Sequence, residues 1–334
     1  MIGRLTQFGA ASAKVKAMYA KRLRPEDFAR ISAMRNVPEV VSFLREHPGW
    51  RGAFDGSFDE TRRGPLEAGL RRYLLSEYTR VLLFVQREDR FILYDRVLRA
   101  EMEQIMRFLR HAGAGRTSDY EADLSALFRI QSRINFDRLS KADTYADMLE
   151  AVKNTRFHGA LSRLPVGEDG FPEYPSVETV MRHHYYKTLM DMVDKRYRGA
   201  TRELLRRAVG SQVDMINITN IMRMRKYFPE RMDTVIPMLL PVRYKLSPAF
   251  IRQLYSAKDD EAAQALLRGS PYGKVFSEHQ FTHIEEYYYQ YIYDFNRKIL
   301  TGGIPSVYTP AAYLSLRDVE LKNLTAAIER VRYA

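Results

Sequence analysis

Histidines and glycine-rich segments are the first residues in this sequence that could support chemistry. His183 and His184 form the only adjacent histidine pair. Neighbouring residues on a helix point in different directions and cannot chelate one ion, and no HExxH or similar ligand spacing accompanies them. Residues 113–118 read GAGRTS, which lacks the GxxxxGK[ST] order of a phosphate loop and follows a helical pattern. We therefore predict no metal site and no nucleotide site, and we expect residues 113–118 to end a helix and link two units.

A group of tyrosines near position 290 could stack on nucleic-acid bases. Consecutive helical residues turn by ~100°, so these rings would spread around the helix instead of forming one platform. The acidic side chains beside them would also repel phosphate. Packing in a core or an interface is therefore the favoured interpretation of the group, which consists of Tyr287, Tyr288, Tyr289, Tyr291 and Tyr293 with Glu285, Glu286 and Asp294 alongside.

Three acid–amide pairs are the remaining polar motif. Each pair places an acid three residues before an amide and is followed by an aliphatic residue. Residues three apart are neighbours on a helix, so we expect a hydrogen bond within the helix, with a contact to a partner as the alternative. The pairs are Glu101–Gln104, Asp214–Asn217 and Glu320–Asn323, separated by 113 and 106 residues.

Composition argues against catalysis. The chain has no cysteine, which excludes disulfides, thiolate metal sites and a cysteine nucleophile. No serine–histidine–acid or other nucleophile–base arrangement is evident. We predict no catalytic, cofactor-binding or metal-binding residues, no cofactor and no small-molecule substrate, and we expect a protein that is not an enzyme.

The charge balance favours anionic partners. The net charge is +12 over 334 residues, and residues 1–115 contribute +7 of it from 21 basic and 14 acidic residues. The arginine doublets at 62–63, 71–72 and 206–207 could grip acidic partners, although a solvated helix face is the simpler interpretation. No apolar stretch reaches the ~18 residues needed to cross a bilayer, and the first residues lack a signal-peptide core. A cytoplasmic location is expected.

Helical periodicity dominates the chain. Leu66, Leu70, Leu74 and their neighbours Tyr73, Glu77 and Val81 follow a three–four spacing, as do Leu93, Val97, Leu98, Met102, Ile105, Met106 and Leu109. The segment Asn36-Val37-Pro38-Glu39 combines a side-chain cap, an early proline and an acid, which together predict a helix start. Alternating strand patterns are absent, so we predict an all-α protein.

Two further features recur with the acid–amide pairs. An aliphatic helix ends in a break with an aromatic residue and a glycine, at Trp50-Arg51-Gly52, Phe157-His158-Gly159 and Tyr272-Gly273. A long helix with aromatic residues lies between the break and the acid, at Arg72-Tyr73-Leu74, His184-Tyr185-Tyr186 and Tyr288-Tyr289-Gln290. The constant order predicts three related helical domains, at 1–115, 116–234 and 235–334. Such units can close into a pseudo-threefold funnel around a central cavity.

At these residues the sequence resembles the C subunit of V/A-type ATPases, which is called the d subunit in the vacuolar enzyme. The resemblance covers nearly the whole chain. It rests on the three-unit organisation, the helix start at 36–40, the break Ser270-Pro271-Tyr272-Gly273 and the segment from Tyr313 to Leu324, YLSLRDVELKNL. The first unit departs slightly, because Gln104 stands where the other two units have asparagine.

The resemblance implies a central-stalk rotor subunit without chemistry of its own. Such a protein seats on the cytoplasmic face of the membrane as a peripheral protein and receives the central shaft in its cavity. It couples the soluble motor to the ion-carrying ring during ATP hydrolysis or synthesis. The implied partners are the shaft subunits and the proteolipid rotor ring, with help from anionic lipid headgroups, and they do not include nucleic acid.

Two alternatives from other classes stay open. The first is a basic α-helical scaffold for RNA or DNA, whose binding would fall steeply with salt. The second is a helical enzyme, which would need a pocket of convergent titratable groups.

Overall fold

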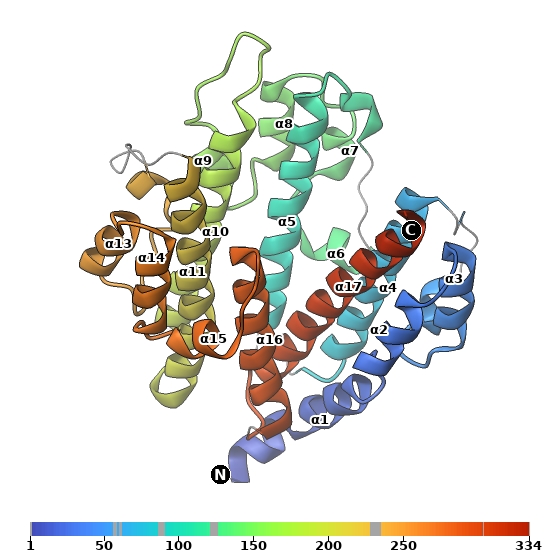
Figure 1. Ribbon diagram of the computed structural model, residues 1–334. Helices are drawn as coiled ribbons and strands as arrows, with labels where there is room; N and C mark the ends of the chain where they lie inside the picture. Colours follow the sequence, from blue (N-terminus) through green and yellow to red (C-terminus); the bar gives the residue numbers. More distant parts are fainter. Residues whose placement is uncertain are drawn as a thin grey trace. The chain divides into compact units, whose positions relative to one another are not determined.

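The structure is a computed structural model that describes residues 2–55, 59, 62–85, 91–120, 126–227, 235–302 and 304–333. Throughout these residues the regular structure is helical and contains no strand (Figure 1). The all-α prediction is confirmed. None of the helices in these ranges is long and apolar enough to span a bilayer.

Long and short helices alternate along the chain. The long ones are α1 (Ile2–Tyr19), α4 (Arg63–Leu82), α5 (Phe91–Ala112), α10 (Tyr174–Arg196), α11 (Gly199–Tyr227), α16 (Ile284–Gly302) and α17 (Thr309–Tyr333). The short ones are α2 (Pro25–Ser32), α3 (Val37–Glu46), η1 (Arg51–Phe54), η2 (Thr117–Asp119), α6 (Ala126–Gln131), α7 (Phe136–Leu139), α8 (Tyr145–Val152), α9 (His158–Leu161), η3 (Ile236–Met238), α13 (Pro248–Tyr255), α14 (Asp260–Arg268) and α15 (Gly273–Glu278).

One order of elements occurs three times. Three short helices are followed by a long middle helix and a long last helix: α2, α3, η1, α4 and α5; then α7, α8, α9, α10 and α11; then α13, α14, α15, α16 and α17. We call these sets the first, second and third repeats. The predicted repetition along the chain is therefore present in the secondary structure. The division into domains at 1–115, 116–234 and 235–334 stays a prediction, and the boundary at 234 falls in residues 228–234, outside the described part.

Side-chain caps explain where many short helices begin. Asn36 accepts a 3.0 Å hydrogen bond from the backbone N–H of Glu39, as the sequence predicted for α3. Thr144, Ser247 and Asp259 cap α8, α13 and α14 in the same way. Each cap satisfies an N–H that has no partner within its own helix, which fixes the first residue of the helix.

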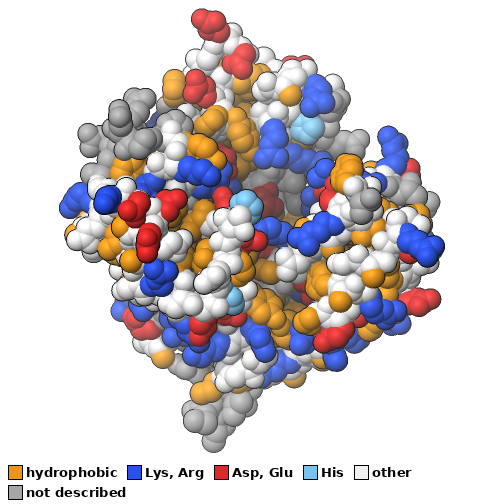
Figure 2. All heavy atoms as spheres, in the orientation of Figure 1, with side chains coloured by type: hydrophobic (Ala, Val, Ile, Leu, Met, Phe, Trp, Pro, Cys, Tyr) orange, Lys and Arg blue, Asp and Glu red, His pale blue; other side chains and the backbone are white. Residues whose placement is uncertain are grey.

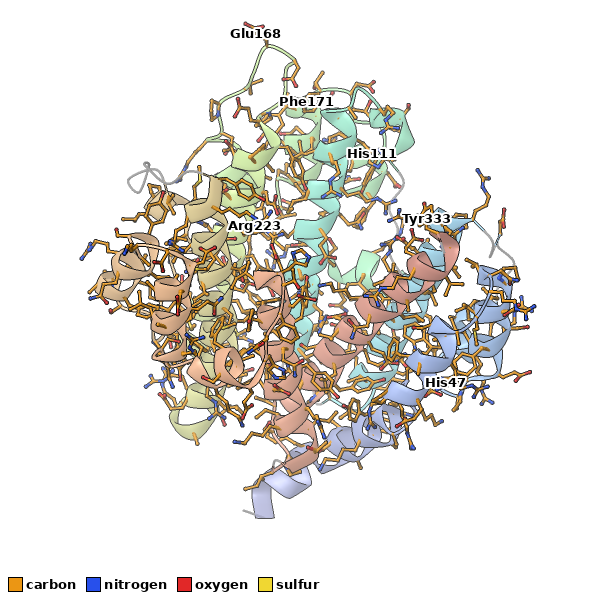
Figure 3. The ribbon with its side chains drawn as sticks, viewed as in Figure 1. His47, His111, Glu168, Phe171, Arg223 and Tyr333 are labelled. Atoms are coloured by element: carbon orange, nitrogen blue, oxygen red, sulfur yellow. The ribbon has the colours of Figure 1, made fainter. Side chains whose placement is uncertain are left out.

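The two long helices predicted in the first third are confirmed as α4 and α5. Leucines 66, 70 and 74 face the core on α4, and Leu98, Ile105 and Leu109 do so on α5. The glycine-rich segment after α5 ends that helix as predicted, with Gly115 at φ +65°. A turn lies at 167–172, with Gly170 at φ +81°, and Figure 3 shows Glu168 and Phe171 on this loop.

The chain forms two compact units, each built from separated segments. The first contains residues Met1–Leu93, Asp123–Ile130 and Tyr293–Ala334. Within it, α17 packs against α1, α2, α3 and α4, so the last helix of the chain lies on its first helices (Figure 1). The shared core joins Leu44, Trp50 and Leu66 to Leu324 and Ile328.

The second unit contains residues Tyr94–Ala122 and Gln131–Ile292. Helices α10 and α11 pack along each other, and α11 also packs on α13. One of its cores joins Met215, Ile218 and Ile221 of α11 to Leu254 of α13 and Leu267 of α14. In the first unit α2 and α3 therefore rest on α17, and in the second unit α13 rests on α11; each of these long helices is the last helix of a different repeat.

Candidate functional site

The three acids singled out in the sequence all lie on last helices and are buried. Glu101 lies on α5, Asp214 on α11 and Glu320 on α17, with exposed fractions of 4%, 0% and 7%. An ionisable side chain removed from water needs hydrogen-bond donors around it. The identity of those donors determines what the acids do.

Glu320 binds the start of the first repeat. Its Oε1 accepts from the backbone N–H of Leu23 at 3.0 Å and from Trp50 Nε1 at 2.8 Å. It also accepts from Arg317, one turn earlier on α17, at 2.7 Å. Leu23 directly precedes Arg24, the N-cap residue of α2. The last helix of the chain is thus joined through one carboxylate to the segment that opens the first repeat.

Arg317 extends this contact into a buried ionic cluster. Its Nε donates to Glu77 at 2.8 Å and its Nη2 donates to the carbonyl of Gly49 at 3.0 Å. The guanidinium also lies 4.3 Å from the centre of the Trp50 ring. Burial alone would lower the pKa of Arg317, but attraction to Glu320 and Glu77 outweighs it and raises that pKa above its ordinary value. The arginine therefore stays charged between two carboxylates.

Asp214 makes the equivalent contact to the third repeat. It accepts from the backbone N–H groups of Lys245 at 2.7 Å, Tyr244 at 3.2 Å and Leu246 at 3.3 Å. The hydroxyl of Tyr272 donates to it at 2.6 Å. Burial raises the pKa of Asp214, and these hydrogen bonds oppose that rise. The segment that donates these N–H groups again lies just before an N-cap residue, here Ser247 of α13.

Glu101 makes the equivalent contact to the second repeat with fewer donors. It accepts from the backbone N–H of Arg133 at 2.7 Å and from the Ser132 hydroxyl at 3.0 Å. Arg133 lies two residues before Asn135, the N-cap residue of α7. Burial raises the pKa of Glu101, and the hydrogen bonds from Arg133 and Ser132 oppose the rise.

One rule describes all three contacts. The acid on the last helix of one repeat binds the backbone that opens the first short helix of the next repeat, and the third repeat binds the first. Backbone N–H groups just before a helix have no helical partner, and a buried carboxylate can satisfy several of them at once. We call these contacts the three inter-repeat carboxylate contacts, made by Glu101, Asp214 and Glu320.

The aromatic residues of the three breaks are buried beside the middle helices, and two of them contact an inter-repeat acid. Trp50, Phe157 and Tyr272 are all buried. Each packs on an aromatic ring of its own middle helix, Trp50 on Tyr73 at 5.9 Å, Phe157 on His184 at 5.4 Å and Tyr272 on Tyr291 at 5.3 Å between ring centroids. Trp50 and Tyr272 also donate a hydrogen bond to the acid, whereas Phe157 has no donor and Ser132 supplies one to Glu101 instead.

The glycines of the three breaks differ in how much space a side chain would find at their positions. A Cβ at Gly273 would lie 1.9 Å from the carbonyl oxygen of Arg268, and one at Gly52 would lie 2.7 Å from the Tyr73 ring. Both positions therefore need glycine for close packing. A Cβ at Gly159 would meet nothing within 4 Å, so the glycine of the second repeat has no such role in packing.

The amides do not pair with the acids, which corrects the expected hydrogen bond within each helix. Asn217 exchanges two hydrogen bonds with the backbone of Leu240, at 2.8 and 3.1 Å. Gln104 accepts from the Tyr120 hydroxyl at 2.9 Å, and Asn323 is exposed. Acid and amide lie one turn apart, and each of the buried groups reaches a separate loop instead of its neighbour.

Sequence reasoning missed Arg317 and Glu77 as members of a site. Glu77 was counted within the apolar face of α4, and an acid on such a face was a signal for a buried partner. Arg317 lies inside the C-terminal segment that carried the family resemblance. The distance of 240 residues between them gave no local sign of their pairing.

The histidine pair and the tyrosine group take packing roles. His183 Nε2 lies 3.4 Å from the carbonyl of Met238, whereas His184 packs on Phe157, so the two rings have different surroundings. In the described ranges no group of three or more histidine and acidic side chains could hold a metal ion. Tyr287 stacks on Phe276 in the core, and Tyr288 accepts a hydrogen bond from Gln212 at 3.0 Å.

One arginine of each doublet pairs with an acid on its own helix or on a neighbouring one. Arg63 binds Glu67 at 2.9 Å, Arg71 lies 3.5 Å from the same carboxylate, and Arg206 binds Asp194 at 2.6 Å. On the face in Figure 2, lysine and arginine side chains are scattered, with acidic side chains among them. Pairs of this kind on a solvated surface match the simpler interpretation of the doublets.

Comparison with known proteins extends the likeness over all three repeats. A family model described as ATP synthase (C/AC39) subunit matches residues 11–334. The C subunit of the A-type ATP synthase of Methanosarcina mazei is 24% identical over 266 residues, covering 79% of this chain and 70% of that protein. The C subunits of Methanosarcina acetivorans and Methanosarcina barkeri are 23% and 22% identical, over 73% and 71% of this chain and 66% and 64% of their own lengths. With the match spanning every helix that carries an inter-repeat carboxylate contact, the chain belongs to the ATP synthase (C/AC39) subunit family.

Proposed function

We propose that this chain is the central-stalk rotor subunit of a V/A-type ATPase or ATP synthase. It joins the shaft of the soluble motor to the ion-carrying membrane ring, and so supports ion transport coupled to ATP hydrolysis or synthesis. The family and the names of its relatives support this role. Membership in this family of non-catalytic ATP synthase subunits confirms that the chain is not an enzyme.

The three inter-repeat carboxylate contacts are the observation that carries the proposal. A part that passes torque must resist slipping between its own segments. Each contact joins one repeat to the next through charge-assisted hydrogen bonds in a buried setting, where loss of one partner is costly. The contact of Glu320 to Leu23 and Trp50 joins the end of the chain to its beginning, so the series has no free end.

The partners follow from this role. The shaft subunits would enter an axial cavity of a pseudo-threefold funnel formed by the three repeats. The opposite face would meet the polar loops of the proteolipid ring on the cytoplasmic side of the membrane, helped by anionic lipid headgroups acting on the basic surface. The net charge of +12 supports such a location.

Reconstitution tests the proposal directly. Purified chain is mixed with the shaft subunits and with the detergent-solubilised ring of the same enzyme, and complexes are separated by size-exclusion chromatography. We expect one complex containing all three components. In vesicles, omission of the chain should abolish ATP-driven ion uptake while ATP hydrolysis by the soluble motor continues. A chain that elutes apart from both the shaft and the ring would refute the proposal.

A mobility-shift assay with RNA and DNA at low salt separates this role from that of a nucleic-acid scaffold. Binding that weakens steeply as salt rises would favour the scaffold. The rotor role predicts that the chain prefers the shaft subunits when these compete with nucleic acid in the same mixture.

A further inference from the structure

An open pocket of about 540 Å³ lies in the first unit, beside the break of the first repeat. Four of its lining side chains are cationic, and Asp55 is the one acid among them. Its volume falls in the range of small-molecule sites, but its lining is polar where such sites are mostly apolar. A polar, cationic hollow of this size suits an anionic ligand.

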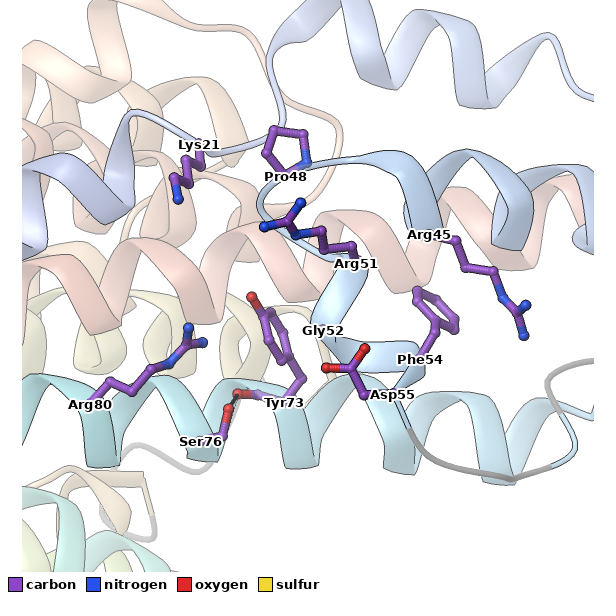
Figure 4. A pocket seen from close by; sticks show the side chains of 10 residues that line it. All are labelled: Lys21, Arg45, Pro48, Arg51, Gly52, Phe54, Asp55, Tyr73, Ser76 and Arg80. Carbon is purple, nitrogen blue, oxygen red and sulfur yellow. Dashed lines mark hydrogen bonds between the residues drawn. The ribbon is translucent and has the colours of Figure 1, made fainter.

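Three of the cations surround one end of the pocket. Figure 4 shows the side chains of Lys21, Arg51 and Arg80 directed toward the space around the Tyr73 hydroxyl. The side chain of Asp55 lies on the other side of the Tyr73 ring in this view. Arg45, the fourth cation, extends away from this space and lies 6.0 Å from the centre of the Phe54 ring. The end defined by Lys21, Arg51, Arg80 and Tyr73 is named the cationic end of the pocket.

Local carboxylates leave the charge of this end largely uncompensated. Within the described part of the chain, neither Lys21 nor Arg51 forms an ion pair. Arg80 lies 3.6 Å from Glu77, but Glu77 also accepts from Arg317 at 2.8 Å and from Tyr313 at 3.0 Å. A bound anion would therefore meet two cations without a carboxylate partner and a third that shares one.

The repeats show that the fold does not require these cations. Lys21 stands three residues before the N-cap of its repeat, Arg51 follows the break aromatic, and Arg80 stands seven residues after the ring that packs on that aromatic. The same positions hold Ser132, His158 and Asp191 in the second repeat and Tyr244, Gly273 and Lys298 in the third. Only the first repeat carries a cation at each of these three positions, although the order of elements is the same in every repeat.

The donor set matches a tetrahedral oxyanion. A guanidinium offers a planar fork to two oxygens of a phosphate, and Arg51 and Arg80 bring two such forks with the Lys21 ammonium and the Tyr73 hydroxyl. The remaining pocket, where Asp55 and Ser76 line the wall, leaves room for the rest of a phosphorylated molecule.

We propose that the cationic end of this pocket binds a phosphate group, carried by a soluble phosphorylated compound or by a lipid headgroup. Neither the geometry of the site nor its test uses the shaft or the ring, so a failure here would leave the proposed coupling of shaft and ring untouched.

Binding to the full-length chain tests the site with two probes. Inorganic pyrophosphate is titrated in a calorimeter, and phosphatidylcholine vesicles with and without phosphatidylglycerol are used in a flotation assay. We expect binding to at least one probe, with pyrophosphate reporting a soluble ligand and phosphatidylglycerol vesicles alone reporting a headgroup. Arg51→Gln and Lys21→Gln should each weaken that binding about tenfold or more, since each removes a charged donor.

Arg35→Gln is the matched control, because Arg35 is exposed and lies outside the pocket. The substitution changes the net charge by the same amount as each test variant. It should leave binding unchanged. Thermal unfolding confirms that each variant is folded. Arg80 is left unchanged in the test because it also pairs with Glu77. Failure of both probes to bind, or equal weakening by Arg35→Gln and Arg51→Gln, would overturn the site.

Discussion

Trp50 Nε1 donates a 2.8 Å hydrogen bond to Glu320 Oε1, although 270 residues separate them in the chain. The indole is fully buried and the carboxylate nearly so, at 0% and 7% exposure. A bond between a neutral donor and a charged acceptor in such a setting is among the stronger hydrogen bonds of a protein. It fastens the break of the first repeat to the last helix, and it has a counterpart in the bond from Tyr272 to Asp214.

Tyr272→Phe isolates the hydroxyl in that counterpart. The ring and its packing on Tyr291 are retained, while the 2.6 Å bond to Asp214 is lost. We expect the free energy of unfolding to fall by about 1–3 kcal/mol, measured by urea denaturation. Tyr227→Phe, at a ring that is 66% exposed, should change it by less than about 0.5 kcal/mol. Similar losses in the two variants would contradict the assigned role of the hydroxyl.

Arg317→Met should destabilise the chain by about 3–5 kcal/mol, because it leaves Glu77 and Glu320 buried without their cation. Denaturant unfolding of the variant measures the loss. The double variant with Arg317→Met and Glu320→Gln should lose less unfolding free energy than the sum of the two single variants. The reason is that Glu320→Gln removes a charge that Arg317→Met leaves unpaired. Strict additivity would show that Arg317 and Glu320 are not coupled.

Asp214→Asn should reveal a pH-dependent contribution to stability. Burial raises the pKa of Asp214 above its ordinary 3.8, so the native state binds this proton more tightly than the unfolded chain. The resulting stabilisation is present when the pH is below the ordinary pKa of an aspartate. It is lost as the pH rises through the raised pKa of Asp214 in the native state. The difference in unfolding free energy between wild type and Asp214→Asn should therefore be larger at about pH 4 than at about pH 7.

Urea unfolding of both proteins at the two pH values gives that difference, and contributions from all other groups cancel in it. Glu101 has a pKa shifted in the same direction, also by burial, so Glu101→Gln should follow the same trend. A difference that increases with pH in either variant would mean that the carboxylate is bound better as the anion in the native state.

Leu324→Ala tests the packing of the last helix on the first repeat. Leu324 is fully buried in the core that it shares with Leu44 and Trp50. We expect a loss of about 2–5 kcal/mol from reduced apolar burial and the cavity left behind. Leu83→Ala, at a side chain that is 80% exposed, should cost less than about 0.5 kcal/mol in the same denaturation assay. A small effect at Leu324 would mean that α17 contributes little to this core.

The sequence by itself determined the helices, their caps and their threefold repetition. These features are local: apolar residues at a three–four spacing select one helix face, and a cap such as Asn36 bonds an N–H only three residues away. The same order of break, aromatic helix and acid could be read three times along the chain, and the family resemblance that it supported is confirmed by the match over residues 11–334. The three acids that make the inter-repeat carboxylate contacts also belong to a motif that recurs in the sequence.

Only the tertiary structure decided what those acids bind. Arg133 lies 32 residues from Glu101, Lys245 lies 31 from Asp214, and Leu23 lies 297 from Glu320. The donors are mainly backbone N–H groups, which every residue except proline carries, so no residue type marks them in the sequence. Packing of the long helices brings one particular loop to each carboxylate, and that choice depends on contacts far apart in the chain. For the same physical reason, the pairing of Arg317 with Glu77 depends on the packing of α17 against α4.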